Sequence, residues 1–197
     1  MKQNRDEKVA KILSSTIQLL SEKGYDNMSI VDIANHAQVY KSLLHYYFKD
    51  KEELVSTALA TKSSSMIQPS KDALSEAKSA DELIDGASVF FKKDMAANPD
   101  FFGLIFETWC AARRSKKIKE EFNASINHTV GDIKIVLENA NTRGFIDLDN
   151  PFEIEAVSRI ILALYHGLAL QFIHNPKILD NQELWNKVRR LLKASLS

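Results

Sequence analysis

Hydroxyl, imidazole and ammonium groups are concentrated in one short stretch of this sequence, VYKSLLHYYFKDKEEL at residues 39–54. The stretch contains three of the five tyrosines in the 197-residue chain. Lys41, Ser42, His45, Tyr46 and Lys51 stand within eleven positions of one another. Such groups donate hydrogen bonds to phosphate oxygens and to the edges of bases, so the first chemistry to consider is nucleic-acid binding.

Catalytic and metal-binding patterns are absent from the sequence. It has no phosphate-binding glycine loop, no Gly-x-Ser-x-Gly elbow and no His-Glu-x-x-His. Cys110 and His166 lack any metal-ligand spacing, and we interpret them as a core pair. We expect no enzyme activity, no metal and no cofactor.

The elements that must position the polar stretch are helices. Apolar residues recur at helical spacing, and six glycines and four prolines fall where helices should begin or end. A first helix is expected near residues 4–23, closed by Gly24. Ser29 with Asp32 forms a capping box for a second helix. A third begins near Tyr40, and a fourth occupies residues 51–66, where Asp50 and Glu53 repeat the capping pattern.

The rest of the chain repeats these signals and predicts five more helices. The caps are Ser79 with Glu82, Asn98 before Pro99, Ser115, Asn150 with Glu153, and Asp180 with Glu183. Gly144 should close the long helix that starts after Ser115. No segment alternates with strand period. The sequence therefore predicts an all-α protein of about nine helices.

The second and third helices, joined by a tight connection, form a helix-turn-helix pattern, in which the second of the two can lie in a DNA major groove. At 100° per residue, Tyr40, Tyr47 and Phe48 fall within about 60° of Leu44, and we expect all four to pack in the core. The opposite face presents groups suited to DNA contact. The predicted DNA-binding residues are Ser29, Lys41, Ser42, Leu43, His45, Tyr46 and Lys51, with Lys2 and Arg5 as a basic arm.

Residues 12–54 resemble the DNA-binding domain of the TetR family of transcriptional regulators. The resemblance is carried by the apolar first helix ending at Gly24-Tyr25, and by further residues in the same order and spacing. These are Ser29, Ile33-Ala34, Ala37, Val39, Leu44, Tyr47-Phe48, Lys51 and Leu54. The resemblance implies an N-terminal helix-turn-helix domain and a C-terminal helical bundle that forms a dimer through the last two helices and holds an effector cavity.

Four positions depart from the family pattern, in which the turn and third helix read roughly Gly-Val-Ser-x-Gly-x-Leu-Tyr. Gln38 stands where a left-handed glycine is usual, a placement that costs a residue with Cβ about 1–2 kcal/mol. Tyr40 cannot cap the third helix as serine does, a loss of about 1 kcal/mol. Ser42 and His45 are the other two departures. Protonation of an imidazole strengthens its attraction for phosphate, so DNA binding is expected to vary between about pH 6 and 8.

The C-terminal half carries signals of a partner surface and of a pocket. Ala163, Gly167 and Ala169 allow close approach of another helix, which favours a homodimer over an intramolecular core. Polar groups embedded among aromatic residues favour a small, mainly apolar effector, aromatic ligands included. The predicted ligand-binding residues are Phe102, Phe106, Trp109, Cys110, Tyr165 and His166.

Composition sets the remaining limits. The chain is 45% hydrophobic and 26% charged, and 26 basic residues balance 26 acidic ones, so a DNA surface must come from a local patch. One cysteine and no signal-peptide pattern favour the cytoplasm. The apolar run 160–173 is shorter than the roughly 18 residues of a membrane span, so we expect a buried helix or an interface and no membrane partner.

We therefore expect a DNA-binding domain at residues 1–50 and a ligand-binding and dimerisation domain at 51–197, linked by the helix at 51–66. The predicted function is that of a dimeric repressor released from a palindromic operator on double-stranded DNA by a small effector. The alternative is an all-α binding module that acts through protein or ligand partners without sequence-specific DNA recognition. Binding to random duplex DNA at two salt concentrations would distinguish them.

Overall fold

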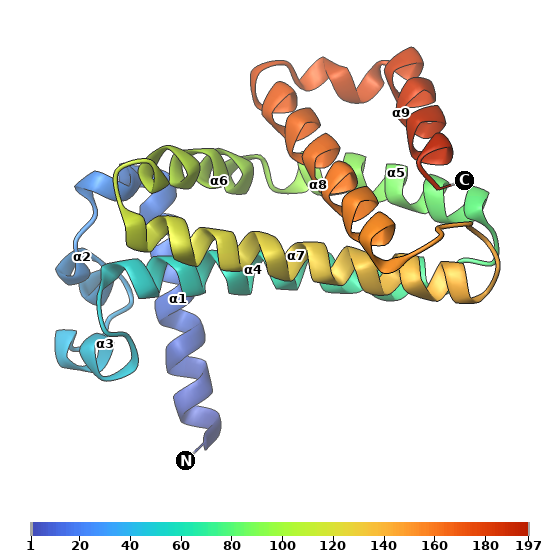
Figure 1. Cartoon of the computed structure of the whole chain (residues 1–197). Coiled ribbons are helices and arrows are strands. Elements are labelled where there is room, and N and C mark those ends of the chain that lie inside the picture. Colours follow the sequence, from blue (N-terminus) through green and yellow to red (C-terminus); the bar gives the residue numbers. More distant parts are fainter. Residues whose placement is uncertain (1, 197) are drawn as a thin grey trace. The chain divides into compact units, whose positions relative to one another are not determined.

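The computed structural model describes the chain from residue 2 to residue 196, with side chains from residue 5 onward. Within this range the prediction of an all-α protein of about nine helices is confirmed, because every regular element is helical (Figure 1). The elements are α1 (Lys2–Asn27), α2 (Ile30–His36), α3 (Lys41–Tyr47), α4 (Lys51–Ser75), α5 (Ala80–Ala97), α6 (Pro99–Ala112), α7 (Lys116–Thr142), α8 (Pro151–His174), the 3-10 helix η1 (Pro176–Asp180) and α9 (Gln182–Ala194).

The chain divides into two compact units, and the division falls inside α4, α6 and α7. Unit 1 comprises the chain through Ser63 together with Gly103–Ser125, and unit 2 comprises Ser64–Phe102 and the chain from Ile126 onward. A boundary between functional domains at residue 50 stays a prediction.

Unit 1 has an aliphatic core assembled from α1, α2, α3 and α4. Its most deeply buried members, each at 2% exposure or less, are Ile12, Leu20, Met28, Ile33, Leu44 and Leu54. Each helix contributes residues from one stripe, as an amphipathic helix must if it is to bury apolar area. The short helices α2 and α3 are therefore held by packing, since seven residues alone would not stay helical in water.

Unit 2 is organised around α8. Ser158 and Ala169 of α8 and Met95 of α5 have no exposed surface, and Val188 of α9 is 2% exposed. The Oγ of Ser158 donates a 2.7 Å hydrogen bond to the carbonyl oxygen of Ile154, which satisfies the buried hydroxyl. Arg189 of α9 forms ion pairs with Asp81 and Asp85 of α5 at 3.0 and 2.7 Å.

Most predicted helix ends are confirmed by their hydrogen bonds. The side chains of Ser79 and Asn150 accept bonds from backbone amides at the starts of α5 and α8. Gly144, with φ 73°, lies just beyond α7. Gly24, with φ 71°, interrupts the helical backbone, but α1 resumes to Asn27 and so is longer than predicted.

Two further helix boundaries were predicted wrongly. The fourth helix does not stop near residue 66, because α4 continues through Pro69 to Ser75. An internal proline costs about 3 kcal/mol. The residues after Pro69 are held by polar contacts within unit 2, where Lys71 pairs with Asp132 at 2.7 Å and Arg143 donates to the carbonyl oxygen of Ser75 at 3.0 Å. The last helix is capped by Asn181 and not by Asp180, since the side chain of Asn181 accepts from the amide of Leu184 at 3.0 Å.

By length and composition, α8 is long and apolar enough to cross a membrane. Its most apolar 18-residue segment has a mean hydropathy of 1.5, and 44% of that segment is buried. Its polar side chains nevertheless have partners within unit 2. Tyr165 donates a hydrogen bond to Asp94 of α5, and Arg159 pairs with Glu155. These contacts support the prediction of a helix that serves a protein core.

Candidate nucleic-acid interface

The first helix of the helix-turn-helix is fixed by a capping box. The Oγ of Ser29 accepts from the amide of Asp32 at 3.1 Å, and the amide of Ser29 donates to the Asp32 carboxylate at 2.9 Å. Lys23 adds an ion pair to Asp32 at 2.8 Å. Hydrogen bonds from Lys23 and Ser29 hold the pKa of Asp32 well below its usual range. Ser29, a predicted DNA contact, therefore already has a structural role at the start of α2.

The turn between α2 and α3 has the backbone of a Schellman motif. The amide of Val39 donates to the carbonyl of Ala34 at 3.0 Å, across a residue in the left-handed region. That residue is Gln38, with φ 53°, and no other non-glycine residue in the described chain has a positive φ. The turn therefore keeps the left-handed conformation that is usual for glycine, although Gln38 carries a Cβ. Lys11 of α1 donates to Oε1 of Gln38 at 3.2 Å.

The two faces of α3 separate as predicted for most residues. Leu44 and Phe48 are buried at 1% and 6% exposure. Lys41, Ser42, His45 and Tyr46 are exposed, and Leu43 is half-buried. The outward face therefore combines one ammonium, two hydroxyls and one imidazole on a helix whose inner side is anchored.

Tyr40 was predicted to join the core, and this is wrong. Its side chain is 86% exposed, because the residue precedes α3 with an extended backbone (φ −71°, ψ 140°) and does not continue the helical phase. It makes no capping hydrogen bond with its side chain, as expected for tyrosine. Tyr40 thus adds an aromatic ring to the exposed surface beside Lys41.

Lys51 lies at the start of α4 but its ammonium is already bound within unit 1. Nζ donates to the carbonyl oxygen of Tyr25 at 2.5 Å and stands 4.1 Å from the centroid of the Tyr25 ring. Burial lowers the pKa of Lys51, and nearby carboxylates oppose that shift. The Tyr25 hydroxyl donates to Glu52 at 3.0 Å. A phosphate contact from Lys51 stays a prediction, and it requires sharing or releasing the Tyr25 carbonyl.

Basic residues of α1 lie along the helix-turn-helix. The guanidinium of Arg5 is 5.6 Å from the centroid of the Tyr47 ring, which brings the predicted basic arm to the end of α3. Lys8 is exposed between Arg5 and Lys11, which contacts the turn. Lys8 and Lys11 were not singled out from the sequence, although their spacing of three and six residues from Arg5 places all three on one helix face.

The residues predicted to bind a ligand fall into two groups. Phe106, Trp109 and Cys110 belong to unit 1, where Trp109 is 46% exposed and Cys110 is exposed. The interpretation of Cys110 and His166 as a core pair is therefore wrong, because the thiol is not in a core. The ring of Trp109 lies edge-on to those of Phe106 and Phe122 at 5.9 and 6.1 Å.

Phe102, Tyr165 and His166 belong to unit 2 and are buried. Phe102 lies edge-on to Tyr165 at 5.4 Å, and His166 is stacked at 5.9 Å from the same ring. Burial, followed by the nearby Asp94 carboxylate, raises the pKa of Tyr165, and burial lowers that of His166 to about 4. Both groups are therefore neutral near pH 7.

Unit 2 contains a cavity of about 100 Å³. Its wall is formed by apolar side chains of several helices, including Leu83, Phe91, Ile133, Leu162 and Tyr165. Of the six predicted ligand residues, Tyr165 alone lines it. The cavity could not be located from the sequence, because its wall residues are drawn from helices separated by more than a hundred positions.

The exposed face of α8 is partly apolar. Phe152, Ile160 and Leu170 are 87%, 57% and 42% exposed, and Ala163 and Gly167 are exposed between them. Ala169, predicted to share this stripe, is fully buried instead.

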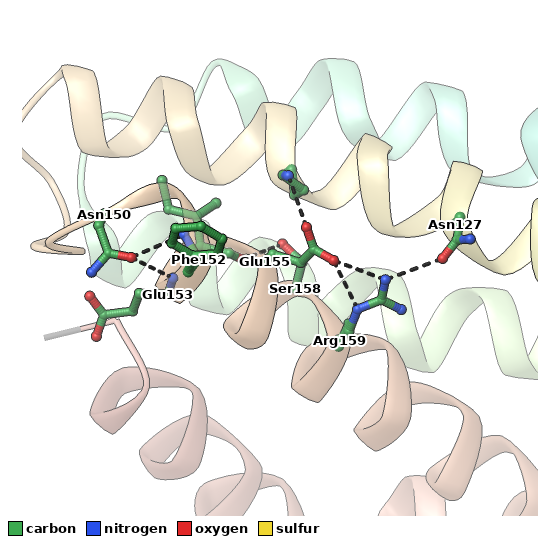
Figure 2. A network of polar contacts seen from close by, with 9 residues as sticks. Asn127, Asn150, Phe152, Glu153, Glu155, Ser158 and Arg159 are labelled. Atoms are coloured by element: carbon green, nitrogen blue, oxygen red, sulfur yellow. Dashed lines mark hydrogen bonds and ion pairs between the residues drawn. The ribbon is translucent and has the colours of Figure 1, made fainter.

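Figure 2 shows a polar network beside this stripe, in which Arg159 donates to Glu155 of α8 at 2.9 Å and to Asn127 of α7 at 3.2 Å. Lys134 also donates to Glu155, at 3.3 Å. No cluster of three potential metal ligands occurs among the described residues.

A capped helix, a left-handed turn and a second helix with an exposed polar face define the helix-turn-helix class of DNA-binding proteins. Residues 12–58 match the family described as bacterial regulatory proteins of the tetR family. The chain is 21% identical over 198 residues to the fatty acid metabolism regulator protein of Bacillus subtilis (strain 168), covering 100% of this chain and 98% of that protein. It is 22% identical over 191 residues to the HTH-type transcriptional regulator QacR of Staphylococcus aureus (strain Mu50 / ATCC 700699). This match covers 95% of this chain and 97% of that protein.

Solved structures agree in fold. The crystal structure of FadR from Bacillus subtilis in complex with stearoyl-CoA matches with a TM-score of 0.71 at 16% identity, covering 95% of this chain and 99% of that one. Residues 12–58 therefore match the TetR family of transcriptional regulators, and the resemblance found in residues 12–54 is confirmed.

Proposed function

We propose that the protein is a cytoplasmic, homodimeric repressor that binds a palindromic operator and leaves it when unit 2 binds a small, mainly apolar molecule. The observation that carries this proposal is the exposed face of α3, where Lys41, Ser42, His45 and Tyr46 project from a helix anchored by Leu44 and Phe48. A rigid helix of this kind can present side chains to a major groove with little loss of conformational freedom on binding.

The proposed DNA-contacting side chains have different roles, which follow from their chemistry. Lys41 binds phosphate and strengthens binding to any sequence, whereas Ser42 and Tyr46 reach base edges and decide which sequence is preferred. Arg5 and Lys8 add phosphate contacts from α1. In a dimer, two α3 helices would meet half-sites about 34–36 Å apart.

The exposed stripe of α8 supports the homodimer. Phe152, Ile160 and Leu170 expose apolar area, and a Cβ added at Gly167 would meet no atom within 4 Å in this chain. A second copy can therefore approach closely at Gly167, and the contact would cover the apolar residues on either side. Leu191 of α9, 61% exposed, extends the same interface.

The cavity of unit 2 supports the ligand response. Ile67 and Lys71 of α4 contribute to its wall, and α4 begins in unit 1 directly after the helix-turn-helix. A ligand that prefers one arrangement of α4 would change the DNA-binding state, and a ligand with equal affinity for both arrangements would change nothing. FadR of Bacillus subtilis is solved with stearoyl-CoA, an acyl compound. We propose a ligand with an apolar part here also.

Fluorescence anisotropy with DNA fragments flanking the gene tests the proposal. Lys41→Ala should weaken binding to all fragments and reduce the salt slope by about 0.9 for each phosphate that is no longer neutralised. Ser42→Ala and Tyr46→Phe should change the order of preference among operator variants by roughly 1–3 kcal/mol per base pair read. Lys116→Ala is the control, because Lys116 is 90% exposed at the start of α7 and outside the proposed contacts. Equal losses from Lys41→Ala and Lys116→Ala would contradict the assigned surface.

Sedimentation of the full chain tests the dimer. Gly167→Arg should convert the dimer to monomers, because Gly167 lies in the proposed interface, and Gly131→Arg should not. An added Cβ finds open space at either position, so neither substitution should disturb the fold. Dimers that survive Gly167→Arg would place the interface elsewhere.

A further inference from the structure

Unit 2 contains a second hollow beside this cavity. An open groove of about 590 Å³ runs between the second half of α4 and α5. Its floor is formed by apolar side chains, including Met66, Pro69, Ala73, Val89 and Ala97. The extension of α4 past Pro69, which the sequence did not predict, supplies one wall of this groove.

The two hollows share part of their walls. Ser70, Leu74 and Phe90 line both the cavity and the groove. Leu74 lies close against α5, since one of its δ carbons is 2.8 Å from the position that a Cβ on Gly86 would take. Leu74 and Phe90, which are half-buried, therefore form a partition between the two spaces.

The cavity half suits a short hydrocarbon segment. Its charged wall residues, Lys71 and Asp132, bind each other at 2.7 Å, and the Tyr165 hydroxyl donates to Asp94. These polar groups are thus already satisfied. By proportion with a 150 Å³ apolar cavity that holds benzene, 100 Å³ accommodates roughly four carbon atoms.

The groove half has charged groups at its margin. Glu76, Glu82 and Asp94 line it, with Lys93 as its basic residue. Asp94 is buried and accepts from Asn98 at 2.9 Å as well as from Tyr165, whereas Glu76 and Glu82 are exposed. Three carboxylates against one ammonium favour a cation over an anion in this groove.

We propose that cavity and groove are the two halves of one site for an amphiphile, whose short apolar tail passes Leu74 and Phe90 into the cavity while its cationic head stays in the groove. This inference rests on the proposed function, because it names the class of effector that unit 2 takes up. It differs from an anionic acyl compound in the charge of the head group.

Calorimetry with the full chain and n-alkyltrimethylammonium salts, below their micellar concentrations, tests the site. Affinity should rise about fourfold per methylene while the tail fills the cavity. Alkyl sulfates of equal length should bind more weakly. Equal or tighter binding of the sulfates overturns the assignment of a cationic head.

Matched substitutions separate the two halves. Ala87 lines the cavity and Ala97 lines the groove, so Ala87→Leu should abolish the dependence on chain length and Ala97→Leu should preserve it. Glu76→Gln, at an exposed position, should weaken the ammonium series roughly two- to fivefold and leave the sulfates unchanged or tighter. A chain-length dependence that survives Ala87→Leu, or no effect of Glu76→Gln, overturns the inference.

Operator binding without amphiphile is measured for each variant, and it should match that of the unmodified chain. Normal operator binding with no uptake of any ammonium salt overturns this inference and leaves the proposed regulator intact. If the unmodified chain does not bind the operator, the proposed function itself is overturned.

Discussion

Replacing Gln38 by glycine should stabilise the protein, although it removes a side chain and a hydrogen bond. The backbone at Gln38 has φ 53°, which costs a residue with Cβ about 1–2 kcal/mol and costs glycine almost nothing. This gain in stability is reduced by roughly 0.5–1 kcal/mol, because glycine increases the conformational entropy of the unfolded chain. The hydrogen bond from Lys11 is exposed at 3.2 Å and contributes at most a few tenths of a kcal/mol.

The net expectation for Gln38→Gly is a gain of about 0.5–1 kcal/mol, or a rise in Tm of about 1–4 °C for a chain of this size. Urea unfolding followed by circular dichroism measures it. Gln18 of α1 is the matched control, because it is also exposed and also makes one side-chain hydrogen bond, to Glu22 at 3.0 Å, but has a helical backbone. Gln18→Gly should cost about 1 kcal/mol.

The opposite signs of these two identical substitutions isolate the backbone conformation. Gln38→Ala separates the hydrogen bond from the strain, since alanine keeps the Cβ and loses only the amide. It should be neutral or slightly destabilising. A loss of stability in Gln38→Gly as large as that in Gln18→Gly would refute the reasoning from left-handed strain.

Three further predictions concern single side chains. Tyr40→Ser should raise the free energy of unfolding by about 1 kcal/mol, because serine can cap α3 and the 86% exposed ring gives up little packing; an unchanged urea midpoint would argue against it. Ser29→Ala should cost about 1 kcal/mol through loss of the cap on α2, and an effect below a few tenths would mean that Asp32 alone holds the helix start. Burial lowers the pKa of His166 from 6.5 to about 4, so this residue binds a proton more tightly in the unfolded chain. The contribution of neutral His166 to the free energy of unfolding is therefore complete above pH 6.5, and it falls by up to about 3 kcal/mol as the pH drops to 4. His166→Gln should remove most of that fall, and parallel pH–stability curves for the two proteins would contradict the assignment.

Local signals in the sequence were reliable where a few neighbouring residues decide the outcome. Ser29, Ser79 and Asn150 begin helices because their side chains accept amides only two or three positions ahead. Gly144 lies beyond a helix because its backbone tolerates positive φ. The exposed polar face of α3 followed from helical phase alone, given one buried residue, Leu44.

Predictions from helical phase and residue propensity were wrong where tertiary contacts override them or where a helix ends. Tyr40 has an extended backbone before α3, so its angle around the helix axis had no meaning. Pro69 should have ended α4, but contacts within unit 2 carry the helix to Ser75. Lys51 was predicted to contact DNA, and only the fold shows that the carbonyl and ring of Tyr25 hold its ammonium.

The sequence by itself therefore determined the helical class, most helix starts, the family and the side chains that α3 exposes, since these depend on short-range spacing. The tertiary structure alone decided where the hollows of unit 2 lie and which residues separate them. Leu74, Gly86 and Phe90 become a partition only when α4 and α5 pack against each other. A cavity is the space left between side chains distant in sequence, and its position depends on contacts that no local pattern encodes.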